Sequence, residues 1–78
     1  MTLSEALATI EAAMLAAMKA QQDHAVTLKV GSHRVTVRSV PTDRAYRVHV
    51  PDKLTGQNVN RKVRTLAGIA SAVRKHTA

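Results

Sequence analysis

The sequence has no cysteine, tryptophan or phenylalanine, and Tyr46 is its only aromatic residue. The lack of cysteine excludes a disulfide framework, a thiolate metal site and a cysteine nucleophile. Single-stranded nucleic acids are usually bound by exposed aromatic side chains that stack on the bases, so this mode is disfavoured as well. The 78 residues suffice for a single domain, 1–78, with a modest core of Val, Leu, Ile, Met and Ala.

Acidic residues are scarce and unevenly distributed. Five Asp and Glu stand against twelve Lys and Arg, which gives a formal net charge of +7. Residues 1–23 contain three acids and one lysine (net −2), so residues 24–78 contain eleven cations and two acids (net +9). This asymmetry favours an acidic partner, with nucleic acid as the first candidate. The alternative is a generally basic protein that stays soluble by self-repulsion.

No pattern predicts catalysis, a metal site or a cofactor. The carboxylates stand in an expected helix and in turns, where no pair is placed for acid–base chemistry. Three scattered glycines form no phosphate-binding loop. Four histidines lack metal-ligand spacing: His24, His33, His49 and His76. We therefore expect a protein that is not an enzyme.

Nor does the sequence predict a membrane segment or a signal peptide. Residues 1–18 lack a basic leader, and Glu5 and Glu11 interrupt an apolar run that is too short to span a bilayer. A cytoplasmic protein without a membrane partner is expected.

Residues 3–21 are expected to form an amphipathic helix. Thr2 stands three residues before Glu5, which is the spacing of a capping box. Apolar residues then recur at helical intervals: Leu3, Leu7, Ile10, Met14, Ala17 and Met18. The reverse side of this helix is also apolar and carries Ala8, Ala12, Leu15 and Ala16. Alanine there can simply support the helix, or the stripe can serve self-association of two copies.

Three strands follow from a period of two within residues 26–30, 34–39 and 45–50. Gly31 and Ser32 fit the two central positions of a type II′ hairpin. Residues 41–44 begin with Pro41, which suits a type I turn. Leu54 is the expected anchor of the next loop, and residues 58–76 are expected to form the second helix. The predicted fold is α+β, α-β-β-β-α, with both helices on one face of a three-stranded antiparallel sheet.

The two turns set the register of the sheet. Lys29 is expected opposite Arg34, and Arg38 opposite Arg47. Such like-charged pairs each destabilise a ladder by up to about 1 kcal/mol. The uncovered face would carry Lys29, Arg34, Arg38, Arg47 and His49 without a carboxylate among them. This composition favours an anion-binding face, although cations on strands also protect a sheet against edge-to-edge aggregation.

The expected second helix begins with three cations, Arg61, Lys62 and Arg64, which its own electropositive N-terminus should repel. Asn58 or Asn60 would cap it. A basic helix N-terminus is a common phosphate site, so an anion is expected there. Lys75 would lie on the same outward arc. Gly68 and Ser71 would separate it from the arginines and let a phosphate backbone come close, although a tight packing contact explains Gly68 equally well.

The α-β-β-β-α order, the size and the segment GQNVNRKVR at the junction of loop and helix resemble the double-stranded-RNA-binding domain. In that family a basic helix N-terminus bridges phosphates. The resemblance implies phosphate contacts from Arg61, Lys62 and Arg64.

Two functional hypotheses follow. The first is a non-catalytic domain that binds duplex phosphates through the sheet face and the second helix. In a second geometry under this hypothesis, the strands enter the major groove of DNA. Base edges and phosphates would then be contacted by Arg34, Thr36, Arg38 and Arg47. The second is a small phage- or mobile-element-encoded inhibitor of the anti-CRISPR type that docks on an acidic protein or ribonucleoprotein. A dimeric structural subunit using the stripe around Leu15 is a further alternative.

Overall fold

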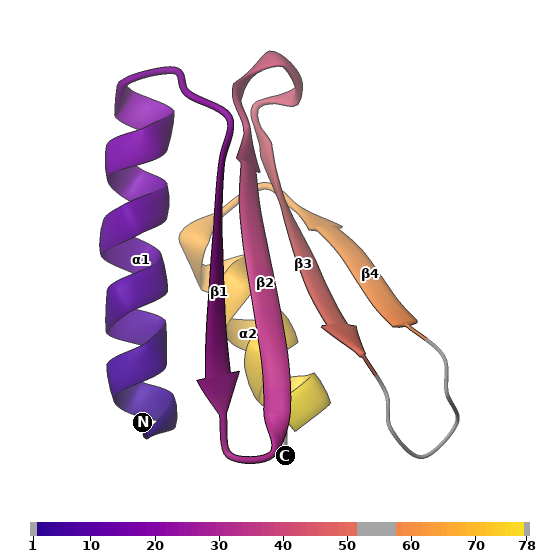
Figure 1. Ribbon diagram of the computed structural model, residues 1–78. Coiled ribbons are helices and arrows are strands. Elements are labelled where there is room, and N and C mark those ends of the chain that lie inside the picture. The colour runs from indigo at the N-terminus through magenta and orange to yellow at the C-terminus, as the bar shows by residue number, and fades with distance from the viewer. Residues whose placement is uncertain (1, 52–57, 78) are drawn as a thin grey trace.

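The computed structural model describes residues 2–51 and 58–77. Its elements are α1 (Leu3–Lys19), β1 (His24–Val30), β2 (His33–Val40), the 3-10 helix η1 (Pro41–Asp43), β3 (Ala45–Pro51), β4 (Asn58–Val63) and α2 (Leu66–Thr77). The four strands form one antiparallel sheet in the order β1-β2-β3-β4 (Figure 1). The α+β class with two helices is confirmed, but the expected count of three strands is wrong. Leu54 lies outside the described residues.

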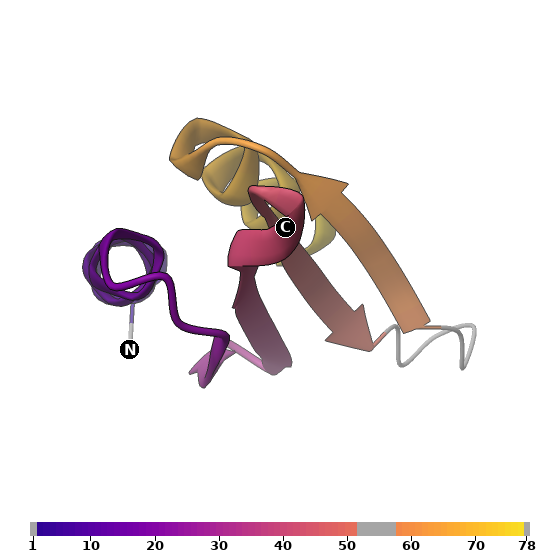
Figure 2. The ribbon, with the colours of Figure 1, turned by 90° about the horizontal axis from the view of Figure 1, so that it is seen from above.

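Both helices cover the same face of the sheet, and the core lies between the two layers (Figures 1 and 2). α1 packs against β1 and β2, whereas α2 packs mainly against β3 and β4. The buried cluster contains Ala6, Ile10, Met14, Val30, Val35, Val37, Tyr46, Val48, Val50, Ile69 and Val73. Tyr46, the single aromatic residue, belongs to this cluster and is 6% exposed, so it offers no ring for base stacking.

Local hydrogen bonds define both ends of α1. The Thr2 hydroxyl oxygen accepts from the backbone N–H of Glu5 at 3.1 Å, and the Glu5 carboxylate accepts from the Thr2 N–H at 3.3 Å, which completes the expected capping box. At the other end the Gln22 N–H donates to the carbonyl of Ala17 at 2.8 Å, while Gln21 has a φ of 53°. This Schellman-type ending stops the helix at Lys19, two residues earlier than expected.

A buried serine joins α1 to the sheet. Ser39 is fully buried, yet its hydroxyl donates to the Gln22 carbonyl at 2.7 Å and accepts from the His24 N–H at 3.0 Å. One hydrogen bond ends on Gln22 in the connection between α1 and β1 and the other on the first residue of β1, so Ser39 of β2 holds the end of that connection beside the sheet.

The two hairpins have the expected register. Gly31 has a φ of 60° and Ser32 has no positive φ, as a type II′ turn requires, and Val30 pairs with His33. In the second hairpin η1 replaces a simple turn and Val40 pairs with Ala45. The expected pairs Lys29 with Arg34 and Arg38 with Arg47 are both present.

The largest correction concerns residues 58–63, which form strand β4 and not the first turns of a helix. Val59 and Val63 are four residues apart, so they suit one side of a strand as well as one side of a helix. Pairing with β3 satisfies backbone groups along an edge that a three-stranded sheet would leave open. The extra strand also departs from the α-β-β-β-α order on which the resemblance to the double-stranded-RNA-binding domain rests.

The true start of α2 is set by Thr65. Its hydroxyl accepts from the backbone N–H of Gly68 at 2.9 Å, so Thr65 caps the helix in place of the expected Asn58 or Asn60.

A Cβ on Gly68 would lie 3.0 Å from the Cβ of Val63. This distance supports the packing interpretation of Gly68, because the glycine lets α2 approach the end of β4.

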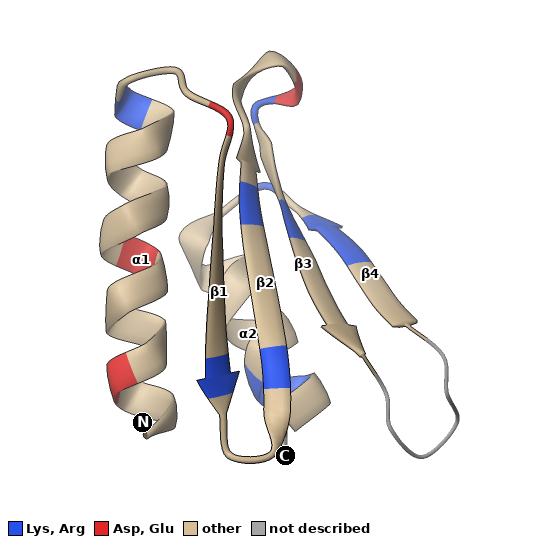
Figure 3. Ribbon diagram, in the orientation of Figure 1, with Lys and Arg blue, Asp and Glu red and all other residues tan. Residues whose placement is uncertain are grey.

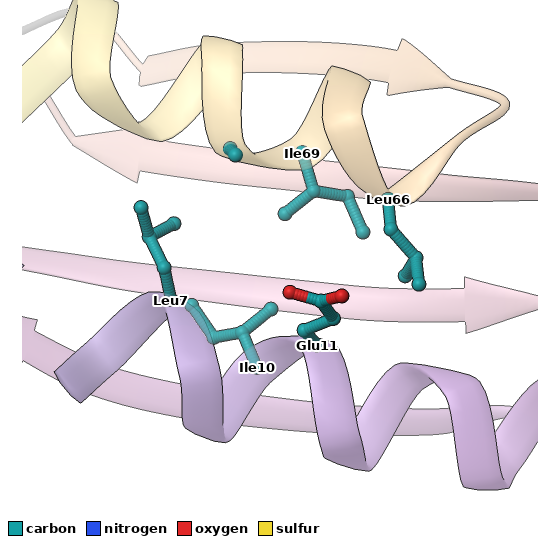
Figure 4. A pocket seen from close by; sticks show the side chains of 6 residues that line it. Leu7, Ile10, Glu11, Leu66 and Ile69 are labelled. Carbon is teal, nitrogen blue, oxygen red and sulfur yellow. The ribbon is translucent and has the colours of Figure 1, made fainter. Parts of the chain in front are cut away.

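The two helices leave a small gap between them. Side chains of Leu7 and Ile10 from α1 point toward Leu66 and Ile69 from α2, and the Glu11 carboxylate lies beside them (Figure 4). Ala70 completes the lining of a cavity of ≈ 20 Å³. The space is about that of one water molecule, so the helices touch here without filling the space between them.

Candidate functional site

We call the face of the sheet that the helices leave uncovered the open face; it is turned toward the viewer in Figure 1. The strand register places alternate side chains of all four strands on it. Its polar members are Thr27, Lys29, Arg34, Thr36, Arg38, Arg47, His49, Asn58, Asn60 and Lys62. The five residues expected on an uncovered face therefore do share one, and β4 adds Asn58, Asn60 and Lys62.

Three cations form a row across neighbouring strands of the open face. Arg38 of β2 pairs with Arg47 of β3, which in turn pairs with Lys62 of β4. Adjacent strands lie about 4.8 Å apart, so the three basic side chains start from closely spaced backbone positions. A second group, Lys29 opposite Arg34, lies toward the other end of β1 and β2. Lys and Arg positions occur on every strand (Figure 3).

Neutral hydrogen-bonding side chains separate these two cationic groups. Thr27, Thr36, His49 and Asn60 stand opposite one another across the four strands. The hydroxyl oxygens of Thr27 and Thr36 are 3.0 Å apart, at hydrogen-bonding distance. The open face therefore offers hydroxyl, imidazole and amide groups between its positive charges.

Two carboxylates approach the cationic row, which corrects the expectation that none lies among these cations. The Arg38 guanidinium donates to both oxygens of Asp23, at 2.6 and 3.0 Å, with 56% and 49% of the two side chains exposed. Lys62 Nζ lies 3.9 Å from Asp43 Oδ2. Asp23 precedes β1 and Asp43 belongs to η1, so both reach the row from connections at one end of the sheet (Figure 3).

The Asp23–Arg38 pair changes the protonation equilibria of both groups. The hydrogen bonds from Arg38 lower the pKa of the Asp23 carboxyl below its ordinary value, and those bonds also raise the pKa of Arg38. Both groups therefore stay charged at neutral pH. Among the described residues no carboxylate forms an ion pair with Lys29, Arg34 or Arg47.

The remaining basic candidates lie away from the open face. Arg61 pairs with Val48, whose side chain is buried on the helix-bearing side, so Arg61 lies on that side too. Arg64 is in the turn between β4 and α2, and Lys75 is an exposed residue of α2. The anion site expected at a helix N-terminus does not form from these residues, because Arg61 and Lys62 belong to a strand and project to opposite sides of it.

The apolar stripe on α1 is exposed as expected. Ala8, Ala12, Leu15 and Ala16 are all accessible. Leu15 is 57% exposed and is the one large apolar side chain of the described residues with this degree of exposure. Self-association through this stripe stays a prediction, as the structure contains a single chain.

The sequence did not predict some residues of the open face or the carboxylates beside it. Asn60 and Lys62 were assigned to a helix, and the counter-charges Asp23 and Asp43 were not connected with the sheet. The alternation of Asn58, Asn60 and Lys62 with Val59 and Val63 is the signal for β4, interrupted only by Arg61. No sequence signal pairs Asp23 with Arg38, since that contact depends on the path of the connection held by Ser39.

Within residues 2–51 and 58–77, no group of three His, Cys, Asp or Glu side chains is placed to hold a metal ion. Neither helix in that part of the chain is long and apolar enough to cross a membrane. Comparison of the chain with protein-family models gives no match, and comparisons with curated proteins and with solved structures give none either. The chemistry of the side chains therefore carries the functional argument.

Proposed function

We propose that the protein is a non-catalytic nucleic-acid-binding domain whose open face contacts backbone phosphates. The observation that carries this proposal is the row of Arg38, Arg47 and Lys62 across three adjacent strands. Directly opposed like charges destabilise a sheet. Asp23 and Asp43 offset part of the charge at the two ends of the row, and a polyanion bound across the row would relieve the repulsion that remains at Arg47. Lys29 and Arg34 extend the positive surface along the strands.

The width of the sheet favours contact across the backbone over insertion into a groove. Four strands span about 14 Å between the outer two, whereas the major groove of B-DNA is roughly 12 Å wide. This comparison disfavours the variant in which the strands enter the major groove and read base edges. Phosphate and sugar contacts position a protein without reading sequence, so we propose binding with little sequence preference.

The ion pair at Arg38 is compatible with phosphate binding. A guanidinium carries five N–H donors, and Asp23 uses the ones on Nε and Nη2. The others stay free to meet a phosphate oxygen. Thr27, Thr36 and Asn60 supply further polar contacts beside the row.

The test compares two double variants with the same change in net charge. Arg34→Gln/Arg47→Gln removes two cations from the open face, while the control Lys19→Gln/Arg74→Gln removes two exposed cations from the helices. Affinity is measured by fluorescence anisotropy on duplex DNA and duplex RNA at about 0.1 M salt. Each lost phosphate contact weakens binding by up to about an order of magnitude.

We expect the open-face variant to bind at least tenfold more weakly and the control to change by less than about threefold. Equal losses in both variants would contradict the proposal, and so would absence of binding at low salt. In the latter case, recovery of a protein partner after nuclease treatment would favour the acidic-protein or ribonucleoprotein alternative.

A further inference from the structure

A second cationic surface lies between β4 and α2, on the helix-bearing side of the sheet. Its cavity, ≈ 280 Å³, is far larger than the roughly 10–15 Å³ that one water needs. The described residues that line it are Arg61, Lys62, Val63, Gly68, Ser71, Ala72, Lys75 and His76. We call this cavity the β4–α2 groove.

Three cations from two elements line the β4–α2 groove: Arg61, Lys62 and Lys75. Arg61 comes from β4 and Lys75 from α2, and His76 and the Ser71 hydroxyl line the same cavity. None of the described lining residues is acidic, and no carboxylate of the described residues forms an ion pair with Arg61 or Lys75. The groove is thus a cationic concavity with a neutral donor beside the charges.

Small residues of α2 contribute to the lining of the groove. Gly68 and Ala72 stand one turn apart on α2, next to Val63 at the end of β4. The contact between Gly68 and Val63 brings helix and strand close together, which brings Lys75 and Arg61 to one opening. A compact ligand can therefore reach both charged groups without displacing a large side chain.

We propose that the β4–α2 groove binds a single phosphomonoester group. Such a group carries about −1.5 to −2 charges at pH 7, which Arg61 and Lys75 together balance. Lys62 adds a third positive charge, which Asp43 partly offsets. A guanidinium presents a planar fork of donors to phosphate oxygens and an ammonium supplies a point charge. The site differs from the open face in its main cations, because Arg61 lies on the helix-bearing side of the sheet, whereas Arg38 and Arg47 lie on the other side. Lys62 belongs to the open-face row and also lines the groove, so the two surfaces adjoin at this residue.

The first experiment titrates the ¹⁵N-labelled protein with inorganic phosphate and follows its amide resonances. We expect saturable shifts at Gly68, Ser71 and Ala72 in the millimolar range. Lys75→Gln should weaken this binding at least fivefold, whereas Lys75→Arg should retain it. Arg74→Gln is the matched control, because Arg74 precedes Lys75 on α2 but lines a different cavity with residues of α1.

The second experiment identifies the source of the phosphoryl group. A short duplex with 5′-phosphates is compared with the same duplex carrying 5′-hydroxyl ends. If the groove takes the end of a nucleic acid, the phosphorylated duplex binds more tightly and Arg61→Gln abolishes the difference. If free phosphate saturates the groove but both duplexes bind equally, the ligand is a small phosphate compound.

Several results would overturn the groove proposal. Shifts that do not saturate, or that are as large around Arg47 as around Ser71, would show nonspecific association of anions with the positive surface. An equal effect of Arg74→Gln and Lys75→Gln would show the same. Arg34→Gln/Arg47→Gln keeps the two proposals distinguishable: we expect it to weaken duplex binding and to leave the phosphate shifts in the groove intact. Loss of those shifts in this variant would contradict a separate site in the groove.

Discussion

At the scale of single residues, Asp23 determines how much of the cationic row is available to a ligand. Its carboxylate receives two hydrogen bonds from Arg38 although both side chains are about half exposed. Exposed ion pairs contribute little to stability. The main consequence of the pair is therefore to orient Arg38 and to place one negative charge beside the open face.

Replacing Asp23 should strengthen binding of nucleic acid to the open face. Asp23→Asn removes a competing carboxylate and leaves Arg38 free to contact phosphate, so we expect affinity for duplex to rise about three- to tenfold near 0.1 M salt. Glu11→Gln is the matched control, because it removes the same charge from α1, beside the gap between the helices. Equal effects of both substitutions in anisotropy titrations would mean that only net charge matters.

The same pair predicts a pH dependence of stability. The folded pKa of Asp23 lies below its ordinary value of 3.8, so its contribution is present above that value and is lost as pH falls through the folded pKa. The melting temperature of the wild type should exceed that of Asp23→Asn near pH 6. The difference should shrink below pH 3 in thermal unfolding followed by circular dichroism. A constant difference across this range would exclude the ion pair as its cause.

Gly68 is expected to resist substitution although it lies in a helix. At an exposed position inside a helix, alanine stabilises the helix by about 1 kcal/mol relative to glycine. At position 68, however, the alanine Cβ would lie 3.0 Å from the Val63 Cβ and 3.2 Å from the Thr65 hydroxyl oxygen. Relief of such overlaps costs typically about 1–3 kcal/mol. We expect Gly68→Ala to lower the free energy of unfolding by about 1 kcal/mol in urea denaturation. Ser71→Ala on the same helix is the control and should be neutral or slightly stabilising; stabilisation by Gly68→Ala would refute the packing role.

At the scale of elements, the parts of the fold that turn chemistry determines were predictable. Gly31 fixes the first hairpin and Pro41 begins the second, so the pairs Lys29 with Arg34 and Arg38 with Arg47 followed from the sequence. When apolar residues alternate with polar ones between two such turns, the two strands of a hairpin can pair in essentially one register. The like-charged pairs of the candidate site could therefore be predicted before the structure.

β4 was not predictable in the same way, because its pattern is ambiguous. Arg61 stands on the helix-bearing side between Val59 and Val63, and so interrupts the alternation that identifies a strand. Arg61 is tolerated there because β4 is an edge strand, where its side chain reaches the groove beside α2. Arg61 and Lys62 project to opposite sides of the sheet only because β4 pairs with β3. Local sequence does not encode this pairing, so the β4–α2 groove could not be predicted either.

The gap between α1 and α2 predicts a stabilising substitution. Ala70 faces the ≈ 20 Å³ cavity that Leu7, Ile10, Leu66 and Ile69 also line (Figure 4). Methionine is flexible enough to fill an irregular space, and each additional buried methylene contributes about 0.8 kcal/mol. We expect Ala70→Met to raise the free energy of unfolding by about 0.5–1 kcal/mol in urea denaturation. Ala67→Met, on the exposed part of α2, should have little effect; equal effects would mean that the gap is not being filled.

At the scale of the whole molecule, charge is divided between α1 and the later elements of the chain. The sheet and the segments after it carry most of the cations, whereas Glu5 and Glu11 belong to α1. Figure 3 shows this separation, with basic positions on all four strands and acidic positions on α1 and the connections. A polyanion is therefore directed toward the strands and α2, because α1 is the less positive part of the molecule.

This distribution predicts a specific salt dependence. Lys29, Arg34, Arg38, Arg47 and Lys62 can neutralise about five phosphates, which implies a log–log slope of affinity against salt of roughly −4.5 for duplex DNA. Between 50 and 200 mM salt the affinity should fall about 500-fold. Arg34→Gln/Arg47→Gln should reduce the slope to roughly −2.7, because two counterion-releasing contacts are lost, whereas Lys19→Gln/Arg74→Gln should leave it unchanged. A slope near zero, or one that is equal in both double variants, would mean that the cations of the open face do not meet phosphates.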